Sequence, residues 1–446
     1  MAPLAERDAG HAGVLLLGHR SAVRDHPADH YPFRQDPSFT YFCGLDEPGA
    51  AVFIRPDATT VFVTPPGPDD ELWDGPRPDA SEGLTADVTV AAIDGLGEAI
   101  ARHRGPILTL PATRADQRHT LGALLGSDHR PSALLVDVVA DLRAVKDTDE
   151  VASIEEAIGR SARIHHRAME IARPGMPVEH VARALRGLAA GEGWRWAYPL
   201  ICTKRGEILH DLAHHGVLET GDLLLVDAGV QSSAGYASDI TRTIPVGGFD
   251  ARTRLVYDTV LAAQNHALGL LAAGVRHLDV HMAAGRVVLD GMADAGLISG
   301  DLDAATEAGA FGVVFPHGLG HLLGIETHDM EGLGEDAVGY DTETPRPDVF
   351  GPSNLRYGRR LRAGTVITVE PGVYFHGPLI ERFRASGRFS GLWNWDALAG
   401  WVGIGGVRIE DVALVTTDGA TLLGPPIPKE PDDLLTRVGR EPDPRS

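Results

Sequence analysis

Two short segments, Val226-Asp227-Ala228-Gly229-Val230 and Val369-Glu370-Pro371-Gly372-Val373, share the pattern Val–acid–small–Gly–Val. Each ends an apolar run, residues 223–226 in the first case and 366–369 in the second, that is typical of a buried β-strand. Two copies of one pattern predict a domain of two related halves that diverged after an internal duplication, rather than a repeat array. We therefore expect each half to present acidic side chains to a shared central cleft.

A second acid follows each of these segments. Asp239 comes after the first and Glu410 after the second, so that the two halves hold four candidate carboxylates. A carboxylate at the end of a buried strand costs several kcal/mol unless it meets a cation or takes up a proton. A single acid of this kind is more often a surface strand end. Four of them in two matching contexts favour a common site.

The stretch Pro316-His317-Gly318-Leu319-Gly320-His321-Leu322-Leu323-Gly324-Ile325-Glu326-Thr327-His328-Asp329 lies in the second half, between the two pairs of acids. Two glycines between His317 and His321 disfavour a helix, because glycine costs a helix interior about 1 kcal/mol relative to alanine. The spacing of these histidines therefore does not indicate a zinc-protease helix, and no glutamate follows His317. Taken alone, such histidines can be metal ligands, acid–base groups or structural residues.

Four carboxylates and one imidazole are a suitable ligand set for two divalent metal ions. Two ions of charge +2 balance four carboxylates, and oxygen ligands with one nitrogen suit Mn²⁺, Co²⁺ or Zn²⁺. Two such ions can share carboxylates and lower the pKa of a shared water toward neutrality. The chain has no Ser or Cys triad signal, no phosphate-binding loop and no dinucleotide fingerprint, which leaves metal-assisted hydrolysis as the favoured chemistry.

The rest of the chain predicts an α/β (α+β) protein of two domains, 1–145 and 146–446. Strands are expected at 13–17, 50–54 and 60–63, and the aromatic segment 32–44 is expected to be a loop that packs on their sheet. Thr148 is a plausible N-cap for the first helix of the second domain. Further helices are expected from Pro177 to about Gly191 and near 250–273 and 277–297.

Composition excludes several classes of function. With a formal charge of −22, the chain lacks the basic surface that nucleic acids and anionic membranes require. Two cysteines cannot form a disulfide framework or a cysteine-based zinc site. No apolar run of eighteen residues occurs, and the first residues lack the order of a signal peptide. We expect a cytoplasmic protein that binds neither nucleic acid nor membrane.

These motifs together resemble the pita-bread metallopeptidases (family M24B), in particular the aminopeptidase P and prolidase (Xaa-Pro peptidase) branch. The segment from Phe33 to Pro48 resembles the small creatinase-like N-terminal α/β domain of that branch, and 142–147 resembles its interdomain junction. The resemblance implies a C-terminal pita-bread domain with pseudo-two-fold symmetry and hydrolysis of Xaa-Pro bonds in peptides. It also implies five metal ligands, which are Asp227, Asp239, His321, Glu370 and Glu410.

Other roles follow from the resemblance by position. Asp227 and Asp239 would hold one metal ion, His321 and Glu370 would complete the other, and Asp239 and Glu410 would bridge both. Mn²⁺ is the expected metal. Glu370 would also shuttle a proton. A homodimer or homotetramer is expected, and its Trp73 would reach a neighbouring subunit's site. The remaining residues would be His210 and His328 as catalytic groups, and His317, Tyr374 and Arg408 around the substrate.

Some features depart from the pattern or leave alternatives open. Asp239 lies twelve residues after Asp227, one more than the commoner interval, and Asp211 follows His210 where the family often has tyrosine. Arg356, 14 residues before Glu370, could bind the carboxylate of a dipeptide, as in prolidases. The alternatives are therefore a strict Xaa-Pro dipeptidase, a metal-free creatinase-like amidinohydrolase and a binding module without activity. The complete ligand set argues against the last two.

Overall fold

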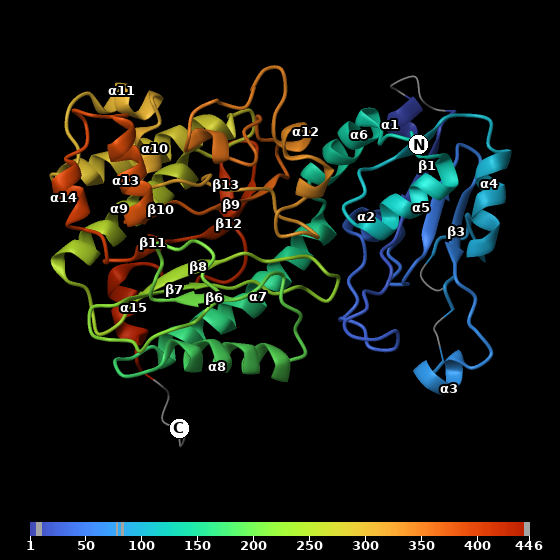
Figure 1. Cartoon of the computed structure of the whole chain (residues 1–446), viewed down its shortest axis with the longest axis horizontal. Helices are drawn as coiled ribbons and strands as arrows, with labels where there is room; N and C mark the ends of the chain where they lie inside the picture. The colour runs from blue at the N-terminus through green and yellow to red at the C-terminus, as the bar shows by residue number, and fades with distance from the viewer. Residues whose placement is uncertain (6–10, 77–78, 82–83, 441–446) are drawn as a thin grey trace. The chain divides into compact units, whose positions relative to one another are not determined.

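The computed structural model describes residues 1–5, 11–76, 79–81 and 84–440. Packing divides the chain into two compact units (Figure 1). The first comprises Met1–Leu142 and Glu331–Val338, and the second comprises Arg143–Met330 and Gly339–Ser446. Our domain boundary at residues 145/146 stays a prediction. None of the helices in the described part of the chain is both long and apolar enough to cross a membrane.

The first unit is built around a five-stranded mixed sheet in the order β4-β3-β2-β1-β5. Neighbouring strands β1, β2 and β3 are antiparallel, whereas β4 and β5 pair in parallel with β3 and β1. The strands are β1 Gly13–Leu17, β2 Ala51–Ile54, β3 Thr59–Val63, β4 Val88–Ala92 and β5 Ile107–Thr109. The first three confirm the predicted strands to within one residue, because short apolar runs between turn-formers fit buried strands.

The helices of the first unit include one that the sequence did not lead us to expect. Residues 37–43, predicted to be loop, form α2 (Pro37–Cys43). Asp36 accepts a hydrogen bond from the Phe39 amide, Pro37 occupies the first turn and Gly44 ends the helix at φ 71°, so both caps are favourable. The others are α1 Ala2–Ala5, α3 Asp70–Asp74, η1 Ile93–Gly95, α4 Leu96–Arg102, α5 Ala115–Leu125, α6 Ala133–Ala144 and η3 Glu331–Leu333, followed by α12 Glu335–Gly339.

The second unit contains two similar assemblies. In the first, α7 (Thr148–Ile171) and α8 (Val178–Gly191) lie along the antiparallel sheet β6-β7-β8 (Figure 1). In the second, α9 (Ala251–Leu270) and α10 (His277–Asp294) accompany the antiparallel sheet β13-β12-β9. The strands are β6 Ile201–Thr203, β7 Leu223–Asp227, β8 Thr241–Pro245, β9 Val366–Val369, β10 Gly372–Tyr374, β11 Gly406–Arg408, β12 Asp411–Val415 and β13 Ala420–Leu422.

The predicted helices of this unit are confirmed, with one corrected cap. Asp147, not Thr148, caps α7, because its carboxylate accepts from the Asp149 and Glu150 amides while Glu150 bonds back to the Asp147 amide. The segment 316–330 contains no helix, as its glycines predicted. The remaining helices are α11 Leu302–Glu307, η2 Ala310–Val313, η4 Pro352–Asn354, α13 Gly377–Ser386, α14 Trp395–Ala399 and α15 Pro431–Arg437.

Hydrogen bonds between β8 and the β11–β12 connection join the two assemblies. The Glu410 amide donates to the Thr241 carbonyl oxygen at 3.1 Å, and the Thr243 hydroxyl donates to the Arg408 carbonyl oxygen at 2.9 Å. Gln264 on α9 donates to the Val369 and Ile409 carbonyls and is fully buried. The Glu410 segment is therefore fixed against β8 of the first half, whereas Gln264 links the Val369 and Ile409 backbone within the second half.

Candidate metal centre

The first pair of acids lies at the edge of the sheet β6-β7-β8. Asp227 is the last residue of β7, opposite Thr241 on β8, and Asp239 precedes β8 by two residues. The Tyr198 hydroxyl lies between them, 2.6 Å from Asp227 Oδ1 and 2.5 Å from Asp239 Oδ1. Gly229 permits this return of the chain, since a Cβ atom there would lie 2.0 Å from the Ser238 carbonyl oxygen.

The second pair of acids flanks the sheet β13-β12-β9. Glu370 directly follows β9, and its amide donates to the Leu319 carbonyl oxygen at 2.8 Å. Glu410 directly precedes β12, and its Oε2 accepts a hydrogen bond from the Thr241 hydroxyl at 2.8 Å. The other oxygen, Oε1, is buried and has no hydrogen-bond partner among the described residues. An ionised oxygen in that state requires a cation or a proton.

His321 joins the two pairs. Its Nδ1 contacts the Leu322 carbonyl oxygen at 3.0 Å, so in the neutral ring Nδ1 carries the hydrogen and Nε2 offers a lone pair. That Nε2 lies 3.3 Å from Asp239 Oδ2 and 3.4 Å from Glu370 Oε1. Gly320 allows the required close approach to β9, because a Cβ atom there would lie 1.9 Å from the Thr368 carbonyl oxygen.

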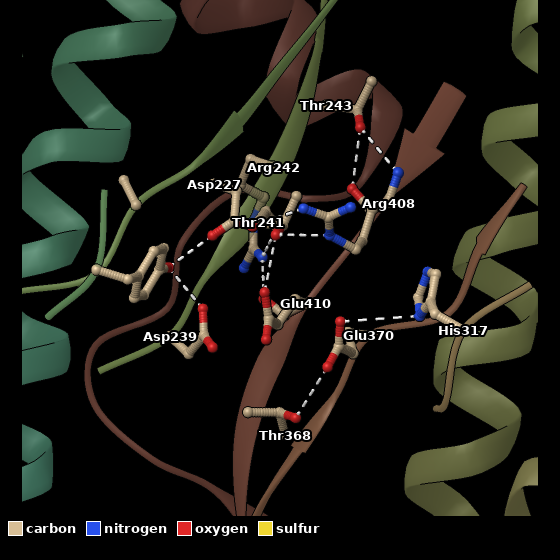
Figure 2. A network of polar contacts seen from close by, with 12 residues as sticks. Asp227, Asp239, Thr241, Arg242, Thr243, His317, Thr368, Glu370, Arg408 and Glu410 are labelled. Atoms are coloured by element: carbon tan, nitrogen blue, oxygen red, sulfur yellow. Dashed lines mark hydrogen bonds and ion pairs between the residues drawn. The ribbon is translucent and has the colours of Figure 1, made fainter. Parts of the chain in front are cut away.

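Arg408 organises the side of the site near Asp227 (Figure 2). Its guanidinium donates to Asp227 Oδ2 at 2.6 Å, to the Thr241 hydroxyl at 3.0 Å and to the Tyr374 hydroxyl at 3.1 Å. The Tyr374 hydroxyl in turn lies 2.7 Å from His317 Nε2, and His317 Nδ1 lies 2.8 Å from the Gly318 carbonyl oxygen. With Nδ1 donating to that carbonyl, Nε2 is the acceptor, which fixes the tautomer of His317.

The buried carboxylates of the site lie close together, and for three of them the pKa is raised above its ordinary value. Burial, with the neighbouring Asp239 and Asp227 carboxylates, raises the pKa of Glu370 to about 7. Burial also raises the pKa of Asp227, against the effect of Arg408, and raises the pKa of Glu410 well above its ordinary value. Divalent cations would stabilise the ionised forms of these three carboxylates.

The donor atoms fit a divalent metal ion. Asp239, His321 and Glu410 are buried, and each offers a ligand atom within 4.8 Å of those of the other two. The unpartnered Glu410 Oε1 and the lone pair of His321 Nε2 are among the atoms available as ligands. The two other acids lie next to these three residues. Asp227 contacts the Tyr198 hydroxyl, which also contacts Asp239, and Glu370 lies 3.4 Å from His321 Nε2. Carboxylate oxygens with one imidazole nitrogen are ligands for Mn²⁺, Co²⁺ or Zn²⁺.

Three further predicted residues lie around the same site. The His328 ring packs edge-on against the His321 ring, with centroids 4.4 Å apart. Burial lowers the pKa of His317 to about 3, and the charges of Arg408, His210 and Arg356 add to this effect. His210 is exposed on the loop after β6, and Arg356 is half-buried before β9. Trp73 belongs to the first unit, where it is 80% exposed on α3.

Sequence reasoning missed three residues that hold the acids. Thr241 and Thr368 could have been found, because each lies two positions from an acid, Asp239 or Glu370, and alternate residues of a strand share a face. The Thr368 hydroxyl indeed lies 3.3 Å from Glu370 Oε1. Tyr198 gave no such signal, since it stands in an irregular segment before β6 and far from either acid in the sequence.

Comparison with known proteins places this site in a family. Residues 152–417, more than half of the chain, match the model of metallopeptidase family M24, and residues 2–100 match the N-terminal domain of aminopeptidase P. The chain belongs to metallopeptidase family M24. Within it, the chain is a member of the aminopeptidase P family, because both domain models match in the order of that family.

The sequence and structure matches to related proteins extend over nearly the whole chain. A probable Xaa-Pro aminopeptidase of Aspergillus fumigatus is 34% identical over 428 residues, which are 92% of this chain and 88% of the relative. Proline aminopeptidase P II from Yersinia pestis superposes with a TM-score of 0.80 at 28% identity, covering 98% of this chain and 97% of that one. Aminopeptidase P from E. coli with the inhibitor Pro-Leu gives a TM-score of 0.77 at 27% identity, with 96% and 94% covered. The predicted fold, an aminopeptidase P-like N-terminal domain and a C-terminal pita-bread domain, is confirmed.

Proposed function

We propose that this metallopeptidase is an Xaa-Pro aminopeptidase, which removes the residue that precedes proline at the N-terminus of a peptide. The observation that carries the proposal is the complete set of four carboxylates and His321, gathered on one site in a chain whose relatives bear this name. A metal-free amidinohydrolase or an inactive binding module would have no need of the buried, unpartnered Glu410 Oε1.

Two divalent ions, Mn²⁺ by preference, are the proposed cofactor. Asp227 and Asp239 would hold one ion, His321 and Glu370 would complete the other, and Asp239 and Glu410 would contribute to both. The shared Tyr198 hydroxyl supports the first pair, and the short distances from His321 Nε2 support the second. When bound, two such ions polarise a carbonyl group and lower the pKa of water.

Other side chains of the site would transfer protons, stabilise developing charge and line the substrate pocket. Glu370 would take the proton of the attacking water and return it to the leaving nitrogen. His328 and His210 would stabilise the negative charge that develops on the scissile carbonyl oxygen. His317, kept neutral by burial and held by Tyr374, would line the proline side of the pocket.

A strict Xaa-Pro dipeptidase is the second candidate, because Arg356 lies close enough for its charge to act on His317. In that case Arg356 would bind the carboxylate of the dipeptide, and a longer peptide, which has no free carboxylate after proline, would not make this contact. We favour the aminopeptidase, since the segment from Phe33 to Pro48 falls within the match to the aminopeptidase P N-terminal domain.

The deciding experiment compares kcat/KM for Xaa-Pro and for Xaa-Pro-Yaa-Zaa in the wild type and in Arg356→Ala. Efficient tetrapeptide cleavage that does not depend on Arg356 supports the aminopeptidase. Dipeptide-only activity that collapses in Arg356→Ala supports the dipeptidase instead. Arg360→Ala is the matched control, because Arg360 is an exposed arginine of the same segment that bonds to Glu343 and the Gly274 carbonyl. Absence of activity on both peptides contradicts both candidates.

The proposed setting is the cytoplasm, with peptides that have proline in second position as substrates and no nucleic acid or membrane as partner. A net charge of −22 supports the exclusion of nucleic acid. A homodimer or homotetramer is also proposed, in which the exposed Leu72 and Trp73 of α3 would be covered by another subunit. Light scattering after size-exclusion chromatography would measure the mass, and a Trp73→Ala chain of unchanged mass would remove Trp73 from the contact.

A further inference from the structure

The loop that follows β6 brings His210 to the site but leaves its side chain exposed to solvent. Residues 204–216 of this loop have no regular secondary structure, and Ile208 and Leu212 beside His210 are 37% and 49% exposed. A catalytic group on such a loop must be held by contacts made elsewhere in the loop, because exposed loops otherwise sample many conformations.

Asp211, the residue after His210, makes the first such contact. Its Oδ2 accepts a hydrogen bond from the Thr203 hydroxyl at 2.7 Å, and its Oδ1 accepts one from the Ala213 amide at 3.0 Å. Thr203 is the last residue of β6 and is buried. Burial alone would raise the pKa of Asp211, but these two hydrogen bonds lower it below its ordinary value, so the carboxylate is ionised at neutral pH.

His214 makes the second contact. Its Nε2 lies 2.7 Å from Arg186 Nη2 on α8, and its Nδ1 lies 3.0 Å from the Cys202 carbonyl oxygen. Because the guanidinium can only donate, Nε2 accepts and Nδ1 donates to the carbonyl, which fixes one neutral tautomer. His214 is buried and adopts φ 53°, a conformation that a side chain other than glycine keeps only when its surroundings enforce it.

Both contacts end on the strand that borders Asp227. Cys202 pairs with Val226 and Ile201 pairs with Asp227 in the antiparallel ladder between β6 and β7. Because β6 and β7 are paired strands of one sheet, a displacement of the loop relative to β6 also displaces His210 relative to Asp227.

We propose that Asp211 and His214 are positioning residues, which clamp the His210 loop to β6 and so hold the His210 imidazole at the reaction site. The proposal rests on the catalytic role of His210 in the proposed function.

The first test is a double-mutant cycle on the Mn²⁺-loaded enzyme. Asp211→Ala should lower kcat for an Xaa-Pro peptide about 10- to 100-fold with little change in KM, as expected for a displaced catalytic group. Asp211→Asn, whose amide oxygen can still accept one hydrogen bond, should recover most of this loss. In a His210→Ala background, Asp211→Ala should cost nothing further. An undiminished loss in that background, or full activity of His210→Ala, would overturn the proposal.

The second test does not depend on activity. Hydrogen–deuterium exchange of peptides covering 204–216 should be faster in Asp211→Ala and in Thr203→Val than in the wild type, and near the wild-type rate in Asp211→Asn. His214→Asn tolerates a positive φ but loses the Arg186 contact, and should also exchange faster. Unchanged exchange in these variants would overturn the clamp even if the enzyme cleaves no Xaa-Pro peptide.

A matched control separates the clamp from a general loss of stability. Asp301 accepts hydrogen bonds from the Asp303 and Ala304 amides on the exposed start of α11, a contact of the same kind outside the site. Asp301→Ala should leave both kcat and the exchange of residues 204–216 unchanged. Circular dichroism at the assay temperature should show every variant folded, so that the exchange differences report the loop alone.

Discussion

At the scale of single residues, Glu410 is held by only one of its two carboxylate oxygens. Oε2 accepts from the Thr241 hydroxyl, while Oε1 is buried and makes no hydrogen bond to the described residues. Replacing this carboxylate with an amide keeps the shape of the side chain and the Thr241 contact but removes a charged ligand.

Glu410→Gln should therefore lower kcat/KM by about 10³-fold or more, which corresponds to roughly 4 kcal/mol of lost stabilisation. The fold should persist, as measured by circular dichroism. Glu307→Gln on the exposed end of α11 is the control and should keep wild-type activity. A fully metallated Glu410→Gln enzyme with near-normal turnover would show that Glu410 does not take part.

Tyr198 holds the other pair, since its single hydroxyl hydrogen is within reach of both Asp227 and Asp239. Tyr198→Phe should weaken metal binding about 10- to 100-fold, the usual effect of losing a group that orients ligands. Calorimetric titration with Mn²⁺ would measure the change. Tyr236→Phe, which removes a hydroxyl bonded to Glu150 away from the site, should bind metal as the wild type does. Equal affinities of the two variants would contradict the assignment.

The acids could be predicted at this scale because buried strands rarely end in charges without a reason, and because the same exception occurred twice. The choice of His321 among the three histidines of its segment came from the family resemblance. Tyr198 could not, since a lone tyrosine in an irregular segment has many ordinary explanations. The position of His210 also depends on how its loop folds back, and no local pattern specifies that. Long-range contacts such as Tyr198 to Asp239 are products of the tertiary fold rather than of sequence spacing.

At the scale of elements, the segment 316–330 contacts β9 without forming a strand of its own. The Thr368 amide donates to the His321 carbonyl oxygen at 3.0 Å and the Glu370 amide to that of Leu319. Gly320 lies between these two bonds, where any side chain would meet the Thr368 carbonyl.

Gly320→Ala should separate this segment from β9 and move His321 away from Asp239 and Glu370. We expect a loss of about 1–3 kcal/mol in stability, typical of a forced core insertion, and a large loss of activity. Urea unfolding and peptide cleavage would measure the two effects. Gly269→Ala on α9 is the control, because its added methyl group meets no atom within 4 Å and alanine favours a helix. Normal activity of Gly320→Ala would contradict the role of this close contact.

Three of the five strands of the first unit, β1, β2 and β3, and the long helices of the second unit were predictable from apolar runs, periodicity and helix-end signals, whereas β4 and β5 were not predicted. The helix α2 was not, because proline, serine and aromatic residues gave the segment the composition of a loop. The N-cap Asp36 and the C-cap Gly44 favour a helix in this segment, and helix-cap signals considered together with composition would have predicted α2.

At the scale of the whole molecule, a buried group of charges holds the loop that carries His328. Arg143 donates to Asp329 Oδ1 at 2.7 Å and Lys146 to Asp329 Oδ2 at 2.8 Å, and all three side chains are almost fully buried. Burial alone would raise the pKa of Asp329, but Lys146 and Arg143 lower it below its ordinary value.

A depressed folded-state pKa gives stability that is present above the unfolded pKa of about 3.9 and is lost as pH falls through the folded value. Asp329→Asn should thus lower stability at pH 7 by about 3–5 kcal/mol, because buried Lys146 and Arg143 would both lose the carboxylate that they share, although Arg143 would keep Glu326. It should also flatten the decline of stability between about pH 5 and pH 2. Urea unfolding across this pH range would measure both.

Asp258→Asn is the control for this prediction, since Asp258 pairs with Arg254 on the exposed face of α9. Its loss should be only about 0.3–0.5 kcal/mol. A loss of the same size in Asp329→Asn would mean that the buried charges do little for stability.

Removal of metal should act on the whole molecule as well. Ions that bind only the folded chain add stability, about 2.7 kcal/mol at one hundred times Kd. Chelation should therefore lower the Tm of the second unit by about 5–10 °C, and added Mn²⁺ should restore it. Elemental analysis before chelation should find roughly two equivalents of metal. An enzyme that keeps its Tm and its activity after complete chelation would contradict a metal centre.

The hydrogen bond from Thr241 to Glu410 spans 169 residues of the chain. A ribosome that adds about 5–20 residues per second needs roughly 10 to 30 seconds to cover that distance. During this time the carboxylates of the first half are exposed on the nascent polypeptide without their partners. The proposed ligand set can therefore be complete only near the end of translation, and a truncated product that ends before Glu410 would lack one of its carboxylates.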